Sequence, residues 1–193
     1  MNGSGGATRR LFVAVPLPAD VMAFALGAQG LLPRSLGIRL LRPEQLHVTL
    51  AFIGEADERM TEAARAVVES VPVASWGEAL IDGFQLLPAA RKVRVISLGI
   101  ADGSGVFSRL FGVVMGGLEA AGVMQREKRP FRAHVTVARV KSPGPVQPMS
   151  DCGQAPFTVE SVCLYESELR RDGAKYTVLA RTALIGANEQ DKA

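Results

Sequence analysis

Apolar patterning along the chain predicts a protein built from many short strands. Residues 10–16 form a continuous apolar run typical of a buried strand, and residues 46–53 predict a longer strand that ends at Gly54. The other segments with strand-like patterns are residues 37–41, 78–87, 92–100, 132–140, 157–165 and 175–184. Because strands predominate and several follow one another directly, we expect an antiparallel sheet.

Three amphipathic or strongly apolar segments predict helices between these strands. They cover residues 18–32, 57–71 and 104–122, the last with Ser104 as its N-cap. Four prolines in residues 141–156 predict a loop. The order strand, helix, strands, helix, strands, helix, strands indicates an α+β fold.

The composition favours one globular domain with a core of its own. The chain has 193 residues, of which 48% are apolar, and a net charge of +3. This is enough to bury a sizeable core, while the small positive charge is compatible with an anionic ligand and is also common without one. The apolar stretch 106–124 contains Arg109 and Glu119, which favour a core helix over a membrane span.

The cysteines and the N-terminal sequence predict the cellular compartment of the protein. Residues 1–8 have the composition of a flexible tail without the apolar segment of a secretion signal. Cys152 and Cys163 lack a Cys-x-x-Cys spacing, so we expect two free thiols in a reducing cytoplasm. No pattern indicates assembly, so we expect a monomer.

The chain has only two histidines, and both lie in the same short motif. Residues 46–51 read LHVTLA and residues 133–138 read AHVTVA. On a strand, residues i and i+2 face the same way. His47 and Thr49 should therefore share one face, as should His134 and Thr136.

The neighbours of these residues define what surrounds each pair. A small residue, Ala51 or Ala138, comes next on the polar face, while Val48, Leu50 and Phe52 should point into the core. The motifs lie about half the chain length apart, which predicts two related lobes facing each other across a cleft. We expect one domain over residues 9–186, with flexible tails at 1–8 and 187–193.

Two imidazoles and two hydroxyls in one cleft suit the opening of a phosphodiester. One histidine can activate water and the other can protonate the departing oxygen, while threonine hydroxyls donate to phosphate oxygens. A single histidine beside a threonine is usually structural, but two matched copies favour function. A zinc site would need a third Cys, Asp or Glu ligand, and none flanks the motifs at a familiar spacing, so no metal or other cofactor is expected.

With these motifs, the sequence resembles the two-histidine (2H) phosphoesterases. It is most similar to the RNA 2′,3′-cyclic phosphodiesterases, formerly named 2′-5′ RNA ligases. The resemblance covers nearly the whole chain and rests on residues 10–15, 46–55, 129–139, 164–167 and 176–179.

The resemblance implies a fold, a reaction and a set of roles. The expected fold has two antiparallel lobes and a positively charged cleft. The implied reaction hydrolyses 2′,3′-cyclic phosphate ends of RNA to 2′-phosphomonoesters, with weak reversible 2′-5′ ligation. By this resemblance, His47 is assigned as the acid for the 3′ oxygen and His134 as the base; the residues themselves do not order these roles.

Four further residues are candidates for substrate binding. The resemblance implies that Arg139 holds the phosphate, but Arg139 is five residues after His134, so a regular strand would turn it away unless a bulge intervenes. Arg132 shares the parity of His134 and should face the cleft mouth. Phe12 and Tyr165 are candidates for stacking on a base, with a core position as the alternative.

The sequence is compatible with three possible functions. The first is hydrolysis of cyclic phosphates on RNA ends. The second applies the same chemistry to small cyclic nucleotides or 2′-5′ oligoadenylates. The third is a non-catalytic protein that binds RNA ends. Ser97 stands where relatives often carry an aromatic residue, which leaves the base preference open.

Overall fold

The computed structural model describes residues 8–33, 37–74, 76–126, 129–146, 150–171 and 173–184. The predicted tails 1–8 and 187–193 lie outside these ranges except for Thr8. Strands in the described residues are Arg9–Pro16 (β1), Ile38–Leu40 (β2), His47–Ala56 (β3), Glu78–Leu87 (β4), Val93–Ala101 (β5), His134–Gly144 (β6), Gln154–Thr158 (β7), Ser161–Arg170 (β8) and Gly173–Ala183 (β9). The helices are Ala19–Gln29 (α1), Glu58–Glu69 (α2) and Val106–Ala120 (α3), with a 3₁₀ turn at Pro43–Gln45 (η1).

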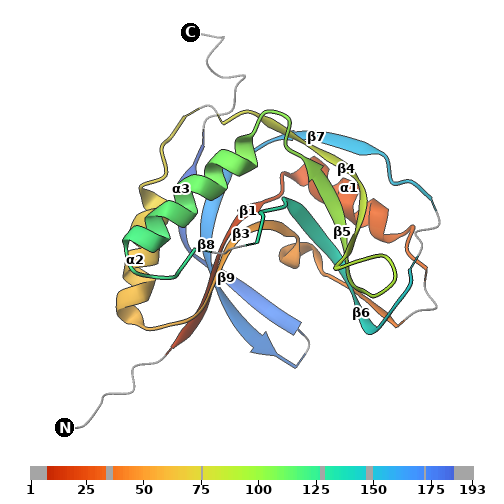
Figure 1. The fold of residues 1–193 in the computed structure, drawn as a ribbon, viewed down its shortest axis with the longest axis horizontal. Helices are drawn as coiled ribbons and strands as arrows, with labels where there is room; N and C mark the ends of the chain where they lie inside the picture. Colours follow the sequence, from red (N-terminus) through yellow and green to blue (C-terminus); the bar gives the residue numbers. More distant parts are fainter. Residues whose placement is uncertain are drawn as a thin grey trace.

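The strands form one curled sheet whose paired neighbours are all antiparallel, so the α+β class is confirmed (Figure 1). Its order is β7-β4-β5-β6-β3-β1-β8-β9, with β2 also paired to β6. Strands β3 and β6, which carry the two histidine motifs, are neighbours in the middle of the sheet. The two halves of the sheet therefore meet where the motifs lie.

The helices cover the sheet in two places (Figure 1). Helix α1 packs against β6 and β7, whereas α2 and α3 pack side by side, α2 against β8 and β9 and α3 against β3. The core beneath them is apolar; Val48, Val135, Phe107 and Leu110, for example, are each 0% exposed. Burial of such side chains stabilises the fold by roughly 1.5–3 kcal/mol each, which fixes the relative positions of β3 and β6.

Two predicted element boundaries were wrong because strands continue through residues that often end them. Gly54 lies inside β3, which runs to Ala56. Its φ of 83° accompanies a register shift against β1 at Ile53, so the glycine accommodates a bulge in place of a turn. The predicted loop 141–156 is partly strand: β6 runs to Gly144, and β7 begins at Gln154 on the sheet edge, where a proline is tolerated.

The predicted N-cap of α3 was also wrong. Ser104 donates its hydroxyl to the carbonyl of Glu78 at 2.6 Å, and Gly105 occupies the cap position with a φ of 70°. The carboxylate of Asp102 accepts instead from the backbone amides of Phe107 and Ser108 at 2.9 and 2.8 Å. By contrast, the predicted start of α2 is confirmed, since Asp57 accepts from the amide of Met60 at 2.7 Å.

Both cysteines are free thiols, with Cys163 buried and Cys152 partly exposed. Helices in the described residues are all too short or too polar to cross a membrane.

Candidate active site

The two His-x-Thr motifs lie side by side and run in opposite directions. Val48 of β3 pairs with Val135 of β6, so the antiparallel register places His47 beside Thr136 and Thr49 beside His134. Both valines are buried and the four polar side chains are partly exposed on the other face. All four line one cleft of about 510 Å³, as the strand parity predicted.

A β-bulge explains how Arg139 reaches this cleft. Ile96 pairs with Ala138 and Ser97 pairs with Thr136, which leaves Val137 as an extra residue in β6. Val137 and Ala138 are consequently both 0% exposed, and the next side chain, Arg139, turns to the cleft that His134 lines. The difficulty that strand parity raised for Arg139 is thereby resolved by the bulge.

The same irregularity occurs in β3 and places Phe52 on the opposite face from the one predicted. Val13 pairs with Ala51 and Ala14 with Thr49, so Leu50 is the extra residue. Leu50 and Ala51 are both 4% exposed, whereas Phe52 is 68% exposed and lines the cleft. The prediction that Phe52 fills the core was wrong because the bulge reverses the alternation after Thr49. Phe52 and Arg139 thus occupy equivalent places in the two motifs.

A buried glutamine holds the bulge in β6. Gln29, at the end of α1, is 8% exposed and donates through Nε2 to the carbonyls of Leu41 and Val137, each at 2.8 Å. The amide of Leu41 donates to the same Val137 carbonyl at 3.0 Å. The carbonyl of the extra residue, Val137, therefore accepts hydrogen bonds from Gln29 and Leu41, which lie outside the strands that pair with β6 at this point. Sequence reasoning missed Gln29, whose only signal was a polar residue in an apolar helix.

Each imidazole is oriented by a backbone carbonyl two residues before it. His134 Nδ1 lies 2.8 Å from the carbonyl oxygen of Arg132, and His47 makes a hydrogen bond with the backbone of Gln45. A carbonyl can only accept, so the bonded ring nitrogen carries hydrogen. In His134 this leaves Nε2 for proton exchange.

The environment of His47 favours its neutral form. Its ring stacks on Phe12 with a centroid distance of 4.9 Å and meets Tyr176 edge-on at 5.5 Å. Burial lowers the pKa of His47 from 6.5 to about 4; the hydrogen bond with Gln45 opposes this shift, and the charges of His134 and Arg139 add to it. The His47 imidazole is therefore uncharged at neutral pH before substrate binds.

The structure gives Phe12 and Tyr165 positions behind the cleft wall. Phe12 is 3% exposed, because His47, Tyr165 and Tyr176 surround its ring at centroid distances of 4.9, 5.0 and 4.9 Å. It has no free face for a base, so the core alternative holds for Phe12. Tyr165 stacks on Phe12 and does not line the cleft, and burial raises the pKa of its hydroxyl. Tyr176, which sequence reasoning did not select, lines the cleft instead.

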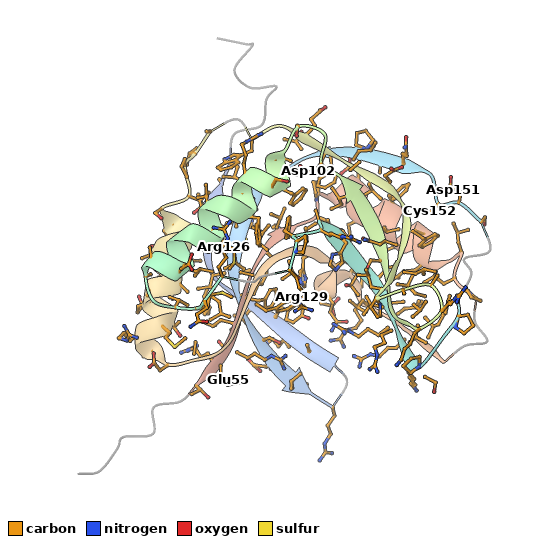
Figure 2. All side chains as sticks on the ribbon, viewed as in Figure 1. Glu55, Asp102, Arg126, Arg129, Asp151 and Cys152 are labelled. Atoms are coloured by element: carbon orange, nitrogen blue, oxygen red, sulfur yellow. The ribbon has the colours of Figure 1, made fainter. Side chains whose placement is uncertain are left out.

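Arginines extend the cleft towards the segment before β6. Arg129 and Arg132 both line it, and Figure 2 shows Arg129 near the centre of the molecule. With Arg139, three guanidinium groups border the space around the two histidines. Such a cleft attracts an anion. Among the described residues, no three His, Cys, Asp or Glu side chains gather in a group that could hold a metal ion.

Comparisons with known proteins match this arrangement. The model of the 2′-5′ RNA ligase superfamily matches residues 23–171. An RNA 2′,3′-cyclic phosphodiesterase of Thermus thermophilus is 32% identical over 190 residues, covering 95% of this chain and 94% of the relative. One from Escherichia coli K12 is 28% identical over 177 residues, covering 91% and 97%.

Solved structures agree with the sequence comparisons. The crystal structure of TT0787 of Thermus thermophilus superposes with a TM-score of 0.78 at 32% identity, covering 92% of this chain and 99% of that one. The apo form of E. coli LigT gives 0.73 at 26% identity, covering 92% and 98%. LigT has also been crystallised with 3′-AMP. The chain belongs to the 2′-5′ RNA ligase superfamily of two-histidine phosphoesterases, the family that its paired motifs resemble.

Proposed function

We propose that this protein is an enzyme that hydrolyses 2′,3′-cyclic phosphate ends of RNA to 2′-phosphomonoesters. The observation that carries the proposal is the gathering of two imidazoles, two threonine hydroxyls and Arg139 around one cleft. Relatives named RNA 2′,3′-cyclic phosphodiesterase, similar over most of the chain, support the same activity. A protein that only bound the phosphate would need the hydroxyls and Arg139 but not two oriented imidazoles.

The proposed reaction uses each polar side chain for a defined step. The guanidinium of Arg139 and the hydroxyls of Thr49 and Thr136 bind the non-bridging phosphate oxygens. His134 accepts a proton from water as the water oxygen bonds to phosphorus. The bond from phosphorus to the 3′ oxygen breaks, and His47 donates its proton to that oxygen. The product is a 2′-phosphomonoester with a free 3′ hydroxyl. If an RNA 5′ hydroxyl attacks phosphorus in place of water, the same step forms a 2′-5′ phosphodiester and frees the same 3′ hydroxyl.

The lowered pKa of His47 means that His47 must gain a proton before it can act as the acid. His47 is neutral before substrate binds, so as the acid it must take up a proton when the anionic phosphate arrives. The phosphate charge favours this uptake because it offsets the positive charges nearby. If the order is reversed, His47 is already in the correct state to act as the base.

A substrate with sulfur at the bridging 3′ position separates the two orders. A thiolate leaves without help from an acid, so the variant that lacks the acid should regain activity on this substrate. Rescue of His47→Ala, and not of His134→Ala, supports His47 as the acid. Rescue of His134→Ala alone would reverse the assignment.

The activity itself is tested with a cyclic-phosphate-ended oligonucleotide in EDTA. We expect a 2′-phosphate product, and kcat lowered by about 10²- to 10⁴-fold in His47→Ala and His134→Ala. Glu69→Gln, a change at an exposed position on α2 that lines neither pocket, serves as the control with full activity. Absence of product from the wild-type protein would refute the proposal, and retained binding without turnover would favour an RNA-end binding protein.

The same chemistry on small nucleotides is the second candidate. It is favoured by the crystal structure of LigT with 3′-AMP, in which a mononucleotide is bound by a relative. Turnover compared on a cyclic mononucleotide, a 2′-5′ adenylate dimer and a cyclic-phosphate-ended RNA distinguishes these substrates. The highest kcat/KM identifies the preferred class.

A further inference from the structure

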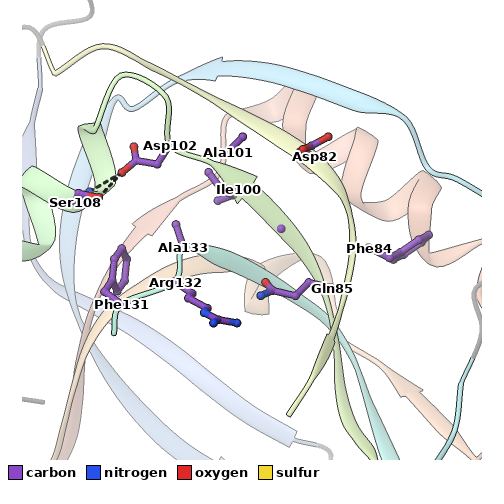
Figure 3. Close-up of a pocket in the computed structure, with 11 residues that line it drawn as sticks. Asp82, Phe84, Gln85, Ile100, Ala101, Asp102, Ser108, Phe131, Arg132 and Ala133 are labelled. Carbon is purple, nitrogen blue, oxygen red and sulfur yellow. Dashed lines mark hydrogen bonds between the residues drawn. The ribbon is translucent and has the colours of Figure 1, made fainter. Parts of the chain in front are cut away.

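A second pocket adjoins the cleft and has no part in the reaction described above. Its volume is about 470 Å³, and it lies between β4, β5, the start of α3 and the segment before β6. It shares Phe131 and Arg132 with the cleft. Figure 3 shows Asp102 and Ser108 at the top of this side pocket and Gln85 and Arg132 at its bottom. Its size is within the range of pockets that bind small organic groups.

The carboxylates of the side pocket are already engaged, whereas its amide is not. Asp102 caps α3 and also accepts from the Ser108 hydroxyl at 2.7 Å, and Asp82 accepts from Gln154 Nε2 at 2.8 Å. Gln85 Oε1, in contrast, is buried without a hydrogen-bond partner among the residues that the structure describes. A buried polar atom left without a partner costs free energy, which a ligand donor would recover.

A glycine lies beside this amide in the side pocket. Gly99 pairs with His134 across β5 and β6, and it lines the side pocket. A Cβ atom at Gly99 would lie 3.8 Å from Gln85 Cβ and 3.9 Å from Gln85 Oε1. A side chain larger than alanine at Gly99 would therefore extend into the side pocket beside Gln85, and glycine leaves this space open.

Arg132 lies at the boundary between the two pockets. Its guanidinium makes no hydrogen bond or ion pair with any other residue that the structure describes. It is two residues before His134, so the two Cα atoms are at most about 7 Å apart, and both side chains line the cleft. A cation placed between a reactive site and an adjoining pocket suits the phosphodiester that joins two nucleotides.

We infer that the side pocket binds the nucleoside that precedes the cyclic-phosphate nucleotide in the RNA chain. Arg132 pairs with the phosphodiester that joins these two nucleotides, and the Gln85 amide hydrogen-bonds the edge of the preceding base. The terminal nucleoside occupies the cleft, whose apolar wall includes Phe52. This inference rests on the proposed function and extends it, because it makes the enzyme prefer RNA ends of at least two nucleotides.

The test measures affinity for reaction products by calorimetry, so it does not depend on turnover. Adenosine 2′-phosphate is compared with four dinucleotides, ApA, CpA, GpA and UpA, each ending in a 2′-phosphate, and with an abasic version of the 5′ residue. We expect at least one dinucleotide to bind about tenfold more tightly than adenosine 2′-phosphate. The abasic version should retain only the part of this gain that comes from the phosphodiester.

Variants of Gln85 and Arg132 test which side chain provides the higher affinity for dinucleotides. Gln85→Met should abolish the advantage of the base over the abasic residue and leave adenosine 2′-phosphate binding unchanged. Arg132→Met should weaken both dinucleotide forms. Arg94→Met is the matched charge control, since Arg94 is exposed on β5 and lines neither pocket, and it should leave the dinucleotide advantage intact.

The outcomes separate this inference from the proposed function. Equal affinity for the mononucleotide and all dinucleotides would overturn the side-pocket assignment, whether or not the protein hydrolyses cyclic phosphates. A change of adenosine 2′-phosphate affinity in Gln85→Met would also overturn it, because the terminal base would then occupy the pocket. Failure to hydrolyse any cyclic phosphate would reject the proposed function, while the affinities would still decide what the side pocket binds.

Discussion

Replacing Gln29 should impair the cleft from a distance, through the bulge that presents Arg139. The Gln29→Leu change keeps the size of the side chain but removes two hydrogen bonds of 2.8 Å, to the carbonyls of Leu41 and Val137. The Val137 carbonyl keeps its bond from the Leu41 amide at 3.0 Å, so the bulge should loosen without being lost. The side chain of Arg139, two residues later, would then be less well positioned.

The expected magnitudes follow from these contacts. A typical hydrogen bond within a protein contributes about 0.5–1.5 kcal/mol, so loss of the two bonds should lower the free energy of unfolding by about 1–3 kcal/mol and Tm by several degrees. A hydrogen bond from a charged group is worth about 1.5–3 kcal/mol, so complete loss of the Arg139 contact would raise KM by roughly 10- to 100-fold. Gln29→Leu should raise KM by part of this factor and change kcat less.

The assay compares KM for a cyclic-phosphate substrate in Gln29→Leu, Arg139→Met and the double variant. Because both changes act on one contact, the double variant should be no worse than Arg139→Met alone. Thr182→Val is the matched control: it removes a buried hydrogen bond of 2.7 Å to the Val68 carbonyl, and Thr182 does not line the cleft. The reasoning fails if Gln29→Leu and Thr182→Val change stability and KM alike, or if the effects on KM add in the double variant.

Two further predictions concern the pKa of His47 and the bulge at Leu50 in β3. Between pH 6.5 and about 4 the unfolded chain protonates His47 and the folded one does not, because the pKa of His47 falls from 6.5 to about 4 on folding. Stability should therefore drop by up to about 3 kcal/mol as pH falls through this window, and urea unfolding of His47→Gln should lack this part of the drop. Phe52→Ala should raise KM and leave Tm nearly unchanged, since Phe52 is 68% exposed. Leu50→Ala removes a side chain that is 4% exposed, so it should lower the free energy of unfolding by about 2–5 kcal/mol. Equal Tm values for the two variants would refute the bulge that places Phe52 in the cleft and Leu50 in the core.

Strand parity predicted the two polar pairs correctly because each pair spans only two residues. His47 and Thr49 share a face, as do His134 and Thr136, since no irregularity separates them. Local sequence likewise predicted the start of α2, where the cap at Asp57 lies within the same turn. Features that depend on neighbouring residues in the chain were therefore accessible without a structure.

The positions beyond each threonine could not be predicted in this way. Each bulge depends on its partner strands, and the one in β6 also on Gln29, which is remote in sequence from Val137. The pattern does contain a signal in retrospect, because two consecutive apolar residues follow each threonine. The core position of Tyr165, which the sequence left as an alternative, has a similar cause. A register shift in the β8–β9 hairpin and the packing of three rings on Phe12 decide which tyrosine lines the cleft.

The pairing of Val48 with Val135 makes the backbone of the cleft nearly symmetric, and this has a consequence for regiochemistry. A symmetric frame would accept a cyclic phosphate in two orientations and release either the 2′ or the 3′ oxygen. Selection of one product must then come from the side chains that differ, chiefly Phe52 on one side and Arg139 on the other. Exchanging these two residues should shift the product ratio from 2′-phosphate towards 3′-phosphate, so that one backbone could produce either isomer.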